Sequence, residues 1–87
     1  MNLIHHIWLD NDVDYQAFKK IDGTFRWKNV KDWQDHILQT ASTFCSKGYV
    51  TKFVPVTFLG YQNYCEQGNL PLNVQTRIRY MLELAAQ

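Results

Sequence analysis

Residues 29–48 read NVKDWQDHILQTASTFCSKG, and they predict the longest helix of the chain. One apolar stripe recurs at helical spacing along this stretch: Val30, Trp33, Ile37, Ala41 and Phe44, flanked by Leu38 and Cys45. Asn29 is a suitable N-cap, because its side-chain oxygen can accept a backbone N–H bond. Gly48 closes the helix, since glycine readily adopts the left-handed conformation that follows a last turn. A helix over 30–46 that buries this stripe is therefore the anchor of the predicted fold.

Two more helices are predicted on the C-terminal side of this anchor, after a short β-prone stretch at 49–54. Pro55 can open the first of them, which runs to about Gln67, and Gly60 in its middle permits the close approach of a neighbouring helix. The inward residues of this helix are predicted to be Phe58, Tyr61 and Cys65. After a turn at 69–71, the last helix spans roughly 71–86. Its predicted buried side chains are Val74, Ile78, Met81, Leu82 and Ala85.

On the N-terminal side, the stretch DNDVDYQAFKKIDG, residues 10–23, predicts a short helix that Asn11 or Asp12 can cap. Its predicted buried face consists of Val13, Ala17 and Ile21, which recur every four residues, with Phe18 beside them. Gly23 is the predicted left-handed C-cap, and a tight hairpin turn at 22–23 is the alternative. Residues 3–9, LIHHIWL, favour a strand over a helical turn.

The chain, residues 1–87, therefore predicts one domain that is mainly α, a small bundle of about four helices with one or two short strands. The candidate strands lie near residues 3–9, 24–28 and 49–54. An α+β fold with a small three-stranded sheet built from these segments is the alternative, and the sequence leaves the choice open.

Charge and hydropathy limit the class of protein. Nine basic residues stand against eight acidic ones, for a net charge of +1, whereas a nucleic-acid-binding domain usually carries a larger basic excess. Nucleic acid therefore ranks below protein as a partner. No apolar run approaches the ~18 residues of a membrane span, and the first residues lack a basic leader. We expect a cytoplasmic protein without a membrane partner, with Cys45 and Cys65 as reduced, buried thiols.

No motif predicts catalysis, a cofactor or a metal. A calcium loop starting at Asp10 would need Gly at position 15 and Glu at position 21, where Tyr15 and Ile21 stand. His5 and His6 are neighbours that point to opposite faces of a strand, and no metal-ligand spacing of Cys or His occurs. A chain this short is also expected to have difficulty enclosing a pocket of some hundreds of Å³. We therefore predict a non-enzymatic protein with no cofactor and no metal.

Thirteen aromatic residues set the functional hypothesis, because a core this small is expected to leave some of them at the surface. In the stretch TFRWK, residues 24–28, alternation turns Phe25 and Trp27 inward and leaves the two cations outward. The predicted partner-binding residues are Tyr64, Arg77, Tyr80, Leu84, Arg26 and Lys28.

The sequence thus predicts a small protein-binding module of regulator, adaptor or inhibitor type, acting through an aromatic-plus-basic surface. A second copy of the chain is one candidate partner. The alternative is a helix-turn-helix DNA-binding protein that uses the two C-terminal helices. Its predicted DNA-contacting residues are Gln75, Thr76, Arg77 and Arg79. The identity of the partner, the oligomeric state and the choice between a DNA-reading motif and a plain helical hairpin stay open.

Overall fold

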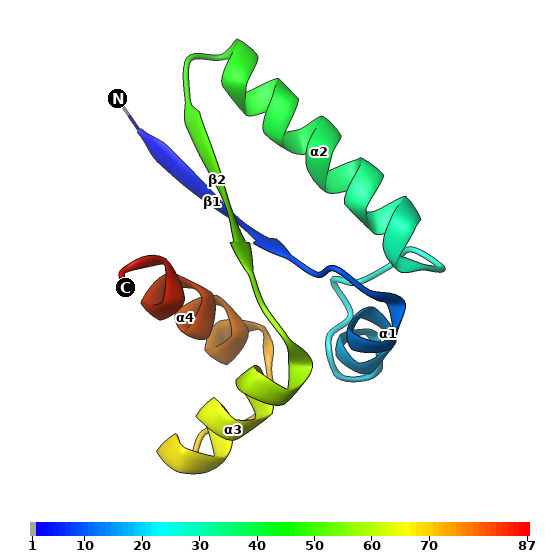
Figure 1. The fold of residues 1–87 in the computed structure, drawn as a ribbon, viewed down its shortest axis with the longest axis vertical. Helices are drawn as coiled ribbons and strands as arrows, with labels where there is room; N and C mark the ends of the chain where they lie inside the picture. The colour runs from blue at the N-terminus through cyan, green and yellow to red at the C-terminus, as the bar shows by residue number, and fades with distance from the viewer. Residues whose placement is uncertain (1) are drawn as a thin grey trace.

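The described residues, 2–87 of a computed structural model, form two strands and four helices (Figure 1). In chain order these are β1 (Leu3–Trp8), α1 (Asp12–Ile21), α2 (Val30–Ser46), β2 (Val50–Pro55), α3 (Phe58–Gly68) and α4 (Val74–Ala85). Met1, the first residue of the predicted domain, lies outside the described part. The mainly α fold with short strands is confirmed. Residues 24–28 are not a strand, so the three-stranded alternative is wrong for residues 2–87.

The two strands pair in parallel, in a register that runs from Leu3↔Val50 to Trp8↔Pro55. Helices α1 and α2 form the crossover between them, and α2 and α4 lie on opposite sides of the strand pair (Figure 1). His6 turns toward α2, where its ring lies 6.0 Å from that of Phe44. Ile7 turns to the other face and joins the core that includes Met81 of α4. Side chains of β1 therefore alternate between two helix layers.

Each helix begins at a side-chain cap. Asn11, Asn29, Thr57 and Asn73 each accept the backbone N–H of the residue three positions later. The N-cap of α2 is the predicted Asn29, and the N-cap of α1 is Asn11, one of the two residues that were predicted for it. The predicted start of the third helix at Pro55 is wrong, because Pro55 pairs with Trp8 in the sheet. The helix begins after Thr57, which is its N-cap.

The buried face of α1 differs from the predicted one. Tyr15 and Phe18 are fully buried, whereas Val13 is 81% exposed and Ile21 is 37% exposed. An aromatic ring removes about 150–250 Å² from water, more than a valine or isoleucine can. The two rings therefore decide which side of this helix turns inward.

The segment between α1 and α2 has no strand partner, because side chains of α1 bind its backbone instead. The Tyr15 hydroxyl donates to the Trp27 carbonyl at 2.7 Å, and Lys19 Nζ donates to the same oxygen at 2.9 Å. Gln16 Nε2 donates to the Lys28 carbonyl at 2.9 Å. These bonds satisfy carbonyl groups that a sheet would otherwise pair. The segment is thereby fastened to α1 as an ordered loop.

The predicted left-handed C-cap at Gly23 is also wrong. Asp22 leaves α1 in an extended conformation, with φ −137° and ψ 107°. Its carboxylate accepts the backbone N–H of Thr24 at 3.0 Å and the Thr24 hydroxyl at 2.6 Å. The turn after α1 is therefore held by a buried carboxylate and does not depend on a glycine with positive φ.

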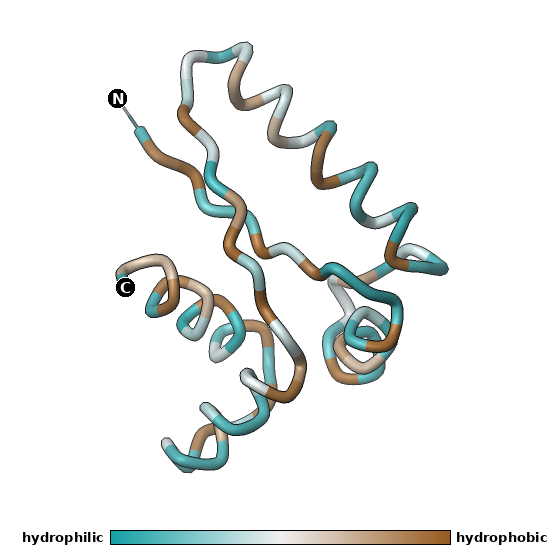
Figure 2. The backbone as a smooth tube through the Cα atoms, in the orientation of Figure 1, coloured by the Kyte–Doolittle hydropathy of each residue, from teal (hydrophilic) through white to brown (hydrophobic). Residues whose placement is uncertain are grey.

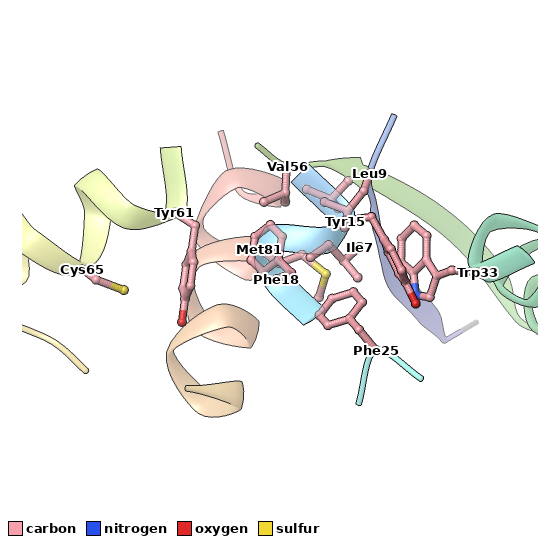
Figure 3. Packing of buried hydrophobic residues seen from close by; sticks show 11 residues of the cluster. Ile7, Leu9, Tyr15, Phe18, Phe25, Trp33, Val56, Tyr61, Cys65 and Met81 are labelled. Atoms are coloured by element: carbon pink, nitrogen blue, oxygen red, sulfur yellow. The ribbon is translucent and has the colours of Figure 1, made fainter. Parts of the chain in front are cut away.

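Aromatic rings fill the interior between the strands and the helices (Figure 3). Tyr15 packs edge-on against Phe25 with ring centroids 5.6 Å apart, and Trp33 lies 5.8 Å from each of these rings. None of the thirteen aromatic side chains, all of which lie in residues 2–87, is exposed. Five of them are buried and eight are half-buried, so the expected surface aromatics are present only as partly exposed rings. The large hydrophobic side chains that stay exposed are aliphatic (Figure 2 shows the hydropathy along the chain).

Helix α4 is rotated relative to the prediction. Met81 is buried as expected, but the other buried residues of this helix are Thr76 and Arg77, while Ile78 is 41% exposed and Leu82 is 47% exposed. Two contacts decide this rotation. Arg77 reaches Asp22 at the end of α1, and Tyr80 packs against α3.

The contact between Tyr80 and α3 confirms the predicted role of Gly60. A Cβ at position 60 would lie 2.5 Å from the Tyr80 hydroxyl oxygen and 2.9 Å from the Thr57 hydroxyl oxygen. Glycine therefore lets α4 approach the N-terminal turn of α3 more closely than any other residue would allow.

Candidate functional site

A cleft of about 430 Å³ lies beside β1, between α2 and α4. Its walls come from β1, the loop after α1, and the facing sides of α2 and α4. All three histidines of the sequence, His5, His6 and His36, line it. The residues of the sheet that line it all belong to β1. The cleft therefore lies on the side of β1 that faces away from β2. It is open to solvent, so it is not the enclosed pocket that a chain this short was expected to have difficulty forming.

The backbone of β1 offers hydrogen-bonding groups to this cleft. Val50 N donates to the Asn2 carbonyl at 3.0 Å, and Val56 N donates to the Trp8 carbonyl at 2.9 Å. In a parallel ladder the residues of one strand alternate between those that bond the partner and those that turn away. Since the even-numbered residues of β1 face β2, the N–H and C=O groups of Leu3, His5 and Ile7 point outward.

The two edges of the sheet differ in their capacity to accept another strand. On β2 the corresponding outward residues are Thr51, Phe53 and Pro55, and a proline has no N–H to donate. Proline on an edge strand is a common protection against unwanted pairing. The outward residues of β1 all keep their N–H groups, and no residue from Leu3 to Trp8 is acidic, lysine or arginine. Thr51 and Phe53 keep their N–H groups, so the edge of β2 differs from that of β1 by the missing donor at its end and by the charge of Lys52. Both features favour the edge of β1 for the addition of a strand.

The accessible part of this edge is its N-terminal half. Leu3 is 50% exposed and His5 is half-buried, whereas Ile7 is only 8% exposed. Near Ile7 the cleft is closed by the loop after α1, which contributes Phe25 and Trp27 to its wall. An incoming backbone therefore meets Leu3 and His5 first.

One wall of the cleft is aromatic. The rings of Trp27 and His36 stack with centroids 4.2 Å apart and an interplanar angle of 28°. This pair joins the loop to α2, and the bonds from Tyr15 and Lys19 to the Trp27 carbonyl hold the loop from its other side. The wall is therefore a fixed surface in this structure.

Arg77 lines the cleft on the side of α4 and forms an ion pair with Asp22 behind it. Arg77 Nε donates to Asp22 Oδ2 at 2.6 Å, and the guanidinium lies 5.1 Å from the centre of the Phe25 ring. Burial alone raises the pKa of the Asp22 carboxyl, but the hydrogen bonds from Thr24 and Arg77 and the charge of Arg77 outweigh it, so the pKa lies below its ordinary value. This ion pair fastens α4 to the loop that closes the cleft.

The rim of the cleft on α4 is apolar. Ile78 lines the cleft, and Leu82 follows four residues later on the same side of the helix. Both side chains are partly open to solvent, as is Leu3 at the start of β1. These three residues give the open edge a hydrophobic border.

His6 lies in the floor of the cleft and is nine-tenths buried. Burial lowers the pKa of its imidazole, and the neighbouring His5 lowers it further. Its Nε2 atom has no hydrogen-bond partner among residues 2–87. The ring packs 5.7 Å from that of Phe53 and 6.0 Å from that of Phe44, so His6 serves as a neutral aromatic side chain of the core.

Of the predicted partner-binding residues, the structure places four in packed positions. Tyr64 and Tyr80 are half-buried, with ring centroids 4.9 Å apart between α3 and α4. Leu84 packs against the core, and Arg77 is buried in its ion pair. Arg26 and Lys28 are exposed on the loop after α1. The predicted set is therefore not one surface, although Arg77 and the loop both border the cleft.

The predicted DNA-contacting residues are likewise divided. Gln75 and Arg79 are exposed, whereas Thr76 and Arg77 are buried. Thr76 donates its backbone N–H and its hydroxyl to Asn73, the cap of α4. DNA binding through this helix stays a prediction that would depend on two of the four residues.

The cysteines take no part in the cleft. Cys65 is buried as predicted, but Cys45 is exposed on α2, with its sulfur 3.5 Å from the Thr51 hydroxyl, so its predicted burial is wrong. Both are free thiols. Within residues 2–87 no three His, Cys, Asp or Glu side chains come together as a metal site.

The sequence did not reveal this cleft, because its lining residues run from His5 to Met81 and meet only through the parallel pairing of the strands. One signal was available. The stretch at 3–9 lacks acidic and basic residues, whereas the stretch at 49–54 contains a lysine and is followed by Pro55. That contrast indicates which strand has the open edge.

Comparisons of the chain with protein-family models, with curated proteins and with solved structures found no match. Within residues 2–87, no helix has both the length and the apolar character that crossing a membrane requires.

Proposed function

We propose that the protein is a non-enzymatic binding module that takes up an extended segment of polypeptide as an additional strand on the open edge of β1. A module of this kind fits a regulator, adaptor or inhibitor of a larger assembly. The observation that carries the proposal is the asymmetry of the sheet. Leu3 and His5 turn their backbone groups away from β2 beside an apolar cleft, while the other edge carries Lys52 and ends at Pro55, which has no N–H.

Strand addition divides the work of recognition between backbone and side chains. The main-chain hydrogen bonds supply affinity for any extended segment, and pockets for alternate side chains supply specificity. Here alternate residues of the incoming strand would face the rim made by Ile78 and Leu82 on one side and the stacked pair of Trp27 and His36 on the other. A partner with apolar side chains on the α4 side is therefore favoured.

Arg26 and Lys28, the basic loop residues of the predicted partner-binding surface, serve as rim contacts in this proposal. Arg26 and Lys28 are exposed on the loop that also contributes Phe25 and Trp27 to the cleft. Acidic residues flanking the bound strand would meet these cations at the rim, where charge affects the association rate more than the affinity.

The composition of the cleft supports binding over catalysis. Three imidazoles line it, but its lining includes no cysteine, aspartate or glutamate. A nucleophile activated by a neighbouring base, or a base oriented by a carboxylate, needs such a partner. The backbone edge of β1 is the feature of this cleft that offers hydrogen bonds to a partner.

The test is a selection of random octapeptides displayed on phage against the wild-type protein, with counter-selection on His5→Pro. This change removes one outward N–H group and leaves the bonds between β1 and β2 intact. Selected peptides should shift the amide resonances of residues 3–7 in a ¹H–¹⁵N NMR spectrum and should bind His5→Ala, which keeps the N–H group. Peptides that shift only residues of α3, or that bind His5→Pro equally well, would refute the proposal.

A further inference from the structure

The cleft beside β1 combines an apolar lining with one permanent positive charge. We propose that it binds a small aromatic carboxylate, whose ring lies against the stacked pair of Trp27 and His36 and whose carboxylate meets the guanidinium of Arg77. The inference goes beyond the proposed function, because it concerns the hollow of the cleft and needs no strand on the edge of β1.

The volume and the lining of the cleft are those of a small-molecule site. Such sites occupy about 300–1,000 Å³ and are lined mostly by hydrophobic and aromatic side chains, with a few convergent polar groups. The cleft measures about 430 Å³. Seven of the twelve residues that line it are apolar or aromatic, and the polar ones are Thr24, Arg77 and the three histidines.

Charge selects an anion as the ligand. Among residues 2–87, Arg77 is the one lining residue with a permanent charge, and the lining includes no aspartate or glutamate. The loop that contributes Phe25 and Trp27 to the cleft also carries two exposed cations, Arg26 and Lys28. A cationic ligand would therefore be repelled here, whereas an anion is attracted by these charges.

The guanidinium of Arg77 has donors left for such an anion. Its Nε atom donates to Asp22 at 2.6 Å and its Nη2 atom donates to Thr24 at 3.4 Å, while within residues 2–87 Nη1 has no acceptor. The fully enclosed side-chain atoms without a partner are His6 Nε2 and Tyr64 Oη, so Nη1 is not sealed inside the protein. The edge made by Nη1 and Nη2 can therefore form the paired N–H···O bonds that a carboxylate accepts.

The apolar walls decide what the rest of the ligand is. Asp22 offsets much of the charge of Arg77, so a simple inorganic anion would gain little and binding needs apolar contact as well. Trp27 and His36 present a stacked pair with ring centroids 4.2 Å apart. Ile78 of α4 also lines the cleft and is 41% exposed. An aromatic ring can stack on the first surface and lie against the second.

The first experiment is a ¹H–¹⁵N NMR titration of the wild-type chain with indole-3-carboxylate and with its neutral match, indole-3-carboxamide. The two probes share one ring system and differ in charge. We expect the acid to shift the side-chain N–H resonances of Arg77 and Trp27 with a dissociation constant below about 5 mM, and to bind at least tenfold more tightly than the amide. The absence of shifts at about 10 mM acid, or equal binding of the acid and the amide, would overturn the inference.

A matched pair of variants tests the charge preference at the rim. Ile78→Glu and Ile78→Gln change the same exposed side chain and differ by one negative charge. Ile78→Glu should bind the acid at least tenfold more weakly than Ile78→Gln does, and both should bind the amide equally. Leu59→Glu, on α3 at a site that is 65% exposed, should bind the acid like the wild type. Circular dichroism checks that each variant is folded. Equal binding of the acid by the two variants at position 78 would contradict the proposal.

Two further measurements test the aromatic part of the ligand. His36→Ala removes one ring of the stacked pair and should weaken both indole probes at least threefold. Acetate, which has the carboxylate without the ring, should cause no shifts at the same concentration. A His36→Ala variant that binds both probes like the wild type, or acetate that binds as well as the indole acid, would refute the proposed contact.

These outcomes are separate from strand addition. A protein that does not bind the acid, but whose amides at residues 3–7 shift with selected peptides, would disprove the small-molecule site and leave the proposed function standing. A protein that binds the acid in the cleft and yields no peptide would do the reverse.

Discussion

The ion pair between Arg77 and Asp22 gives the sharpest test of how the fold is held together. The two side chains come from residues 55 positions apart and fasten α4 to the end of α1. Their side chains are only 10% and 2% exposed. Replacing Arg77 with methionine keeps an apolar stem but removes the guanidinium that lies over Phe25, and it leaves the Asp22 carboxylate buried without its counter-ion.

The expected loss is about 3 kcal/mol of unfolding free energy. Breaking a buried pair by removing one partner typically costs about 3–5 kcal/mol. The lower value applies here, because Asp22 keeps the hydrogen bonds from the Thr24 amide and hydroxyl at 3.0 Å and 2.6 Å. At roughly 0.05–0.15 kcal/mol per residue, a chain of this length has a total stability of about 4–13 kcal/mol. The midpoint of thermal unfolding should therefore fall by about 12–24 °C.

Urea denaturation of four proteins measures this effect: wild type, Arg77→Met, Asp22→Asn and the double variant. The double variant should recover most of the lost stability, because it buries no unpaired charge, so the coupling energy of the cycle should be about 2 kcal/mol. Arg79→Met, at an exposed position on the same helix, should change stability by less than about 0.5 kcal/mol. A loss below about 1 kcal/mol in Arg77→Met, or a double variant no better than that single one, would refute the reasoning.

Three other outcomes are expected. Gly60→Ala should lower the unfolding free energy by about 1 kcal/mol, although alanine favours a helix. The reason is that its methyl group would lie 2.5 Å from the Tyr80 hydroxyl oxygen. Urea denaturation measures the loss, and adding Tyr80→Phe should recover part of it. Lowering the pH should reduce stability in two steps, because the folded-state pKa values of His6 and Asp22 are both lowered. The unfolded chain therefore takes up protons first, below about pH 6.5 at His6 and below about pH 4 at Asp22. The first step should shrink in His6→Gln and the second should be absent in Asp22→Asn, and unchanged urea midpoints across both pH windows would contradict this. Burial raises the pKa of Tyr61 to about 12, with the neighbouring Cys65 adding to the effect, and burial also raises the pKa of Tyr15 and Tyr80. Stability should therefore fall as the pH rises above about 10. Absorbance at 295 nm should show that Tyr61→Phe loses the last of the tyrosine ionisation steps, and a variant that keeps this last step would disprove the assignment.

The parts of the fold that were predictable are those fixed by local interactions. The bounds of α2, Val30–Ser46, match the predicted helix because Asn29, Gly48 and the apolar stripe between them all act within a few residues of each other. The start of α1 at the Asn11 cap has the same origin. The end of the sequence-predicted third helix was also close, because its C-terminal turn is set by the local conformation of Asn69, which has φ 54°.

The orientation of α4 could not be predicted, because this helix carries two apolar stripes. One contains Ile78 and Leu82 and the other contains Tyr80 and Leu84. Local propensity does not distinguish them. The choice is made by Asp22, which binds Arg77, and by Gly60, which admits Tyr80. Both lie far from α4 in sequence, so the exposed rim of the cleft became visible only with the structure.

The aromatic content and the open edge have one explanation. A sheet of two strands offers little surface for helices to cover, so large rings from the helices and the loop fill the space between the layers. Five of the thirteen rings are buried and the other eight are half-buried, so no ring is fully exposed to form the predicted surface patch. Two strands also leave two edges, and natural proteins usually protect both. The edge of β2 carries Lys52 and ends at Pro55, whereas the edge of β1 presents the backbone groups of Leu3 and His5 without a charged side chain. This difference is why we propose the edge of β1, bordered by aliphatic side chains, as the binding surface.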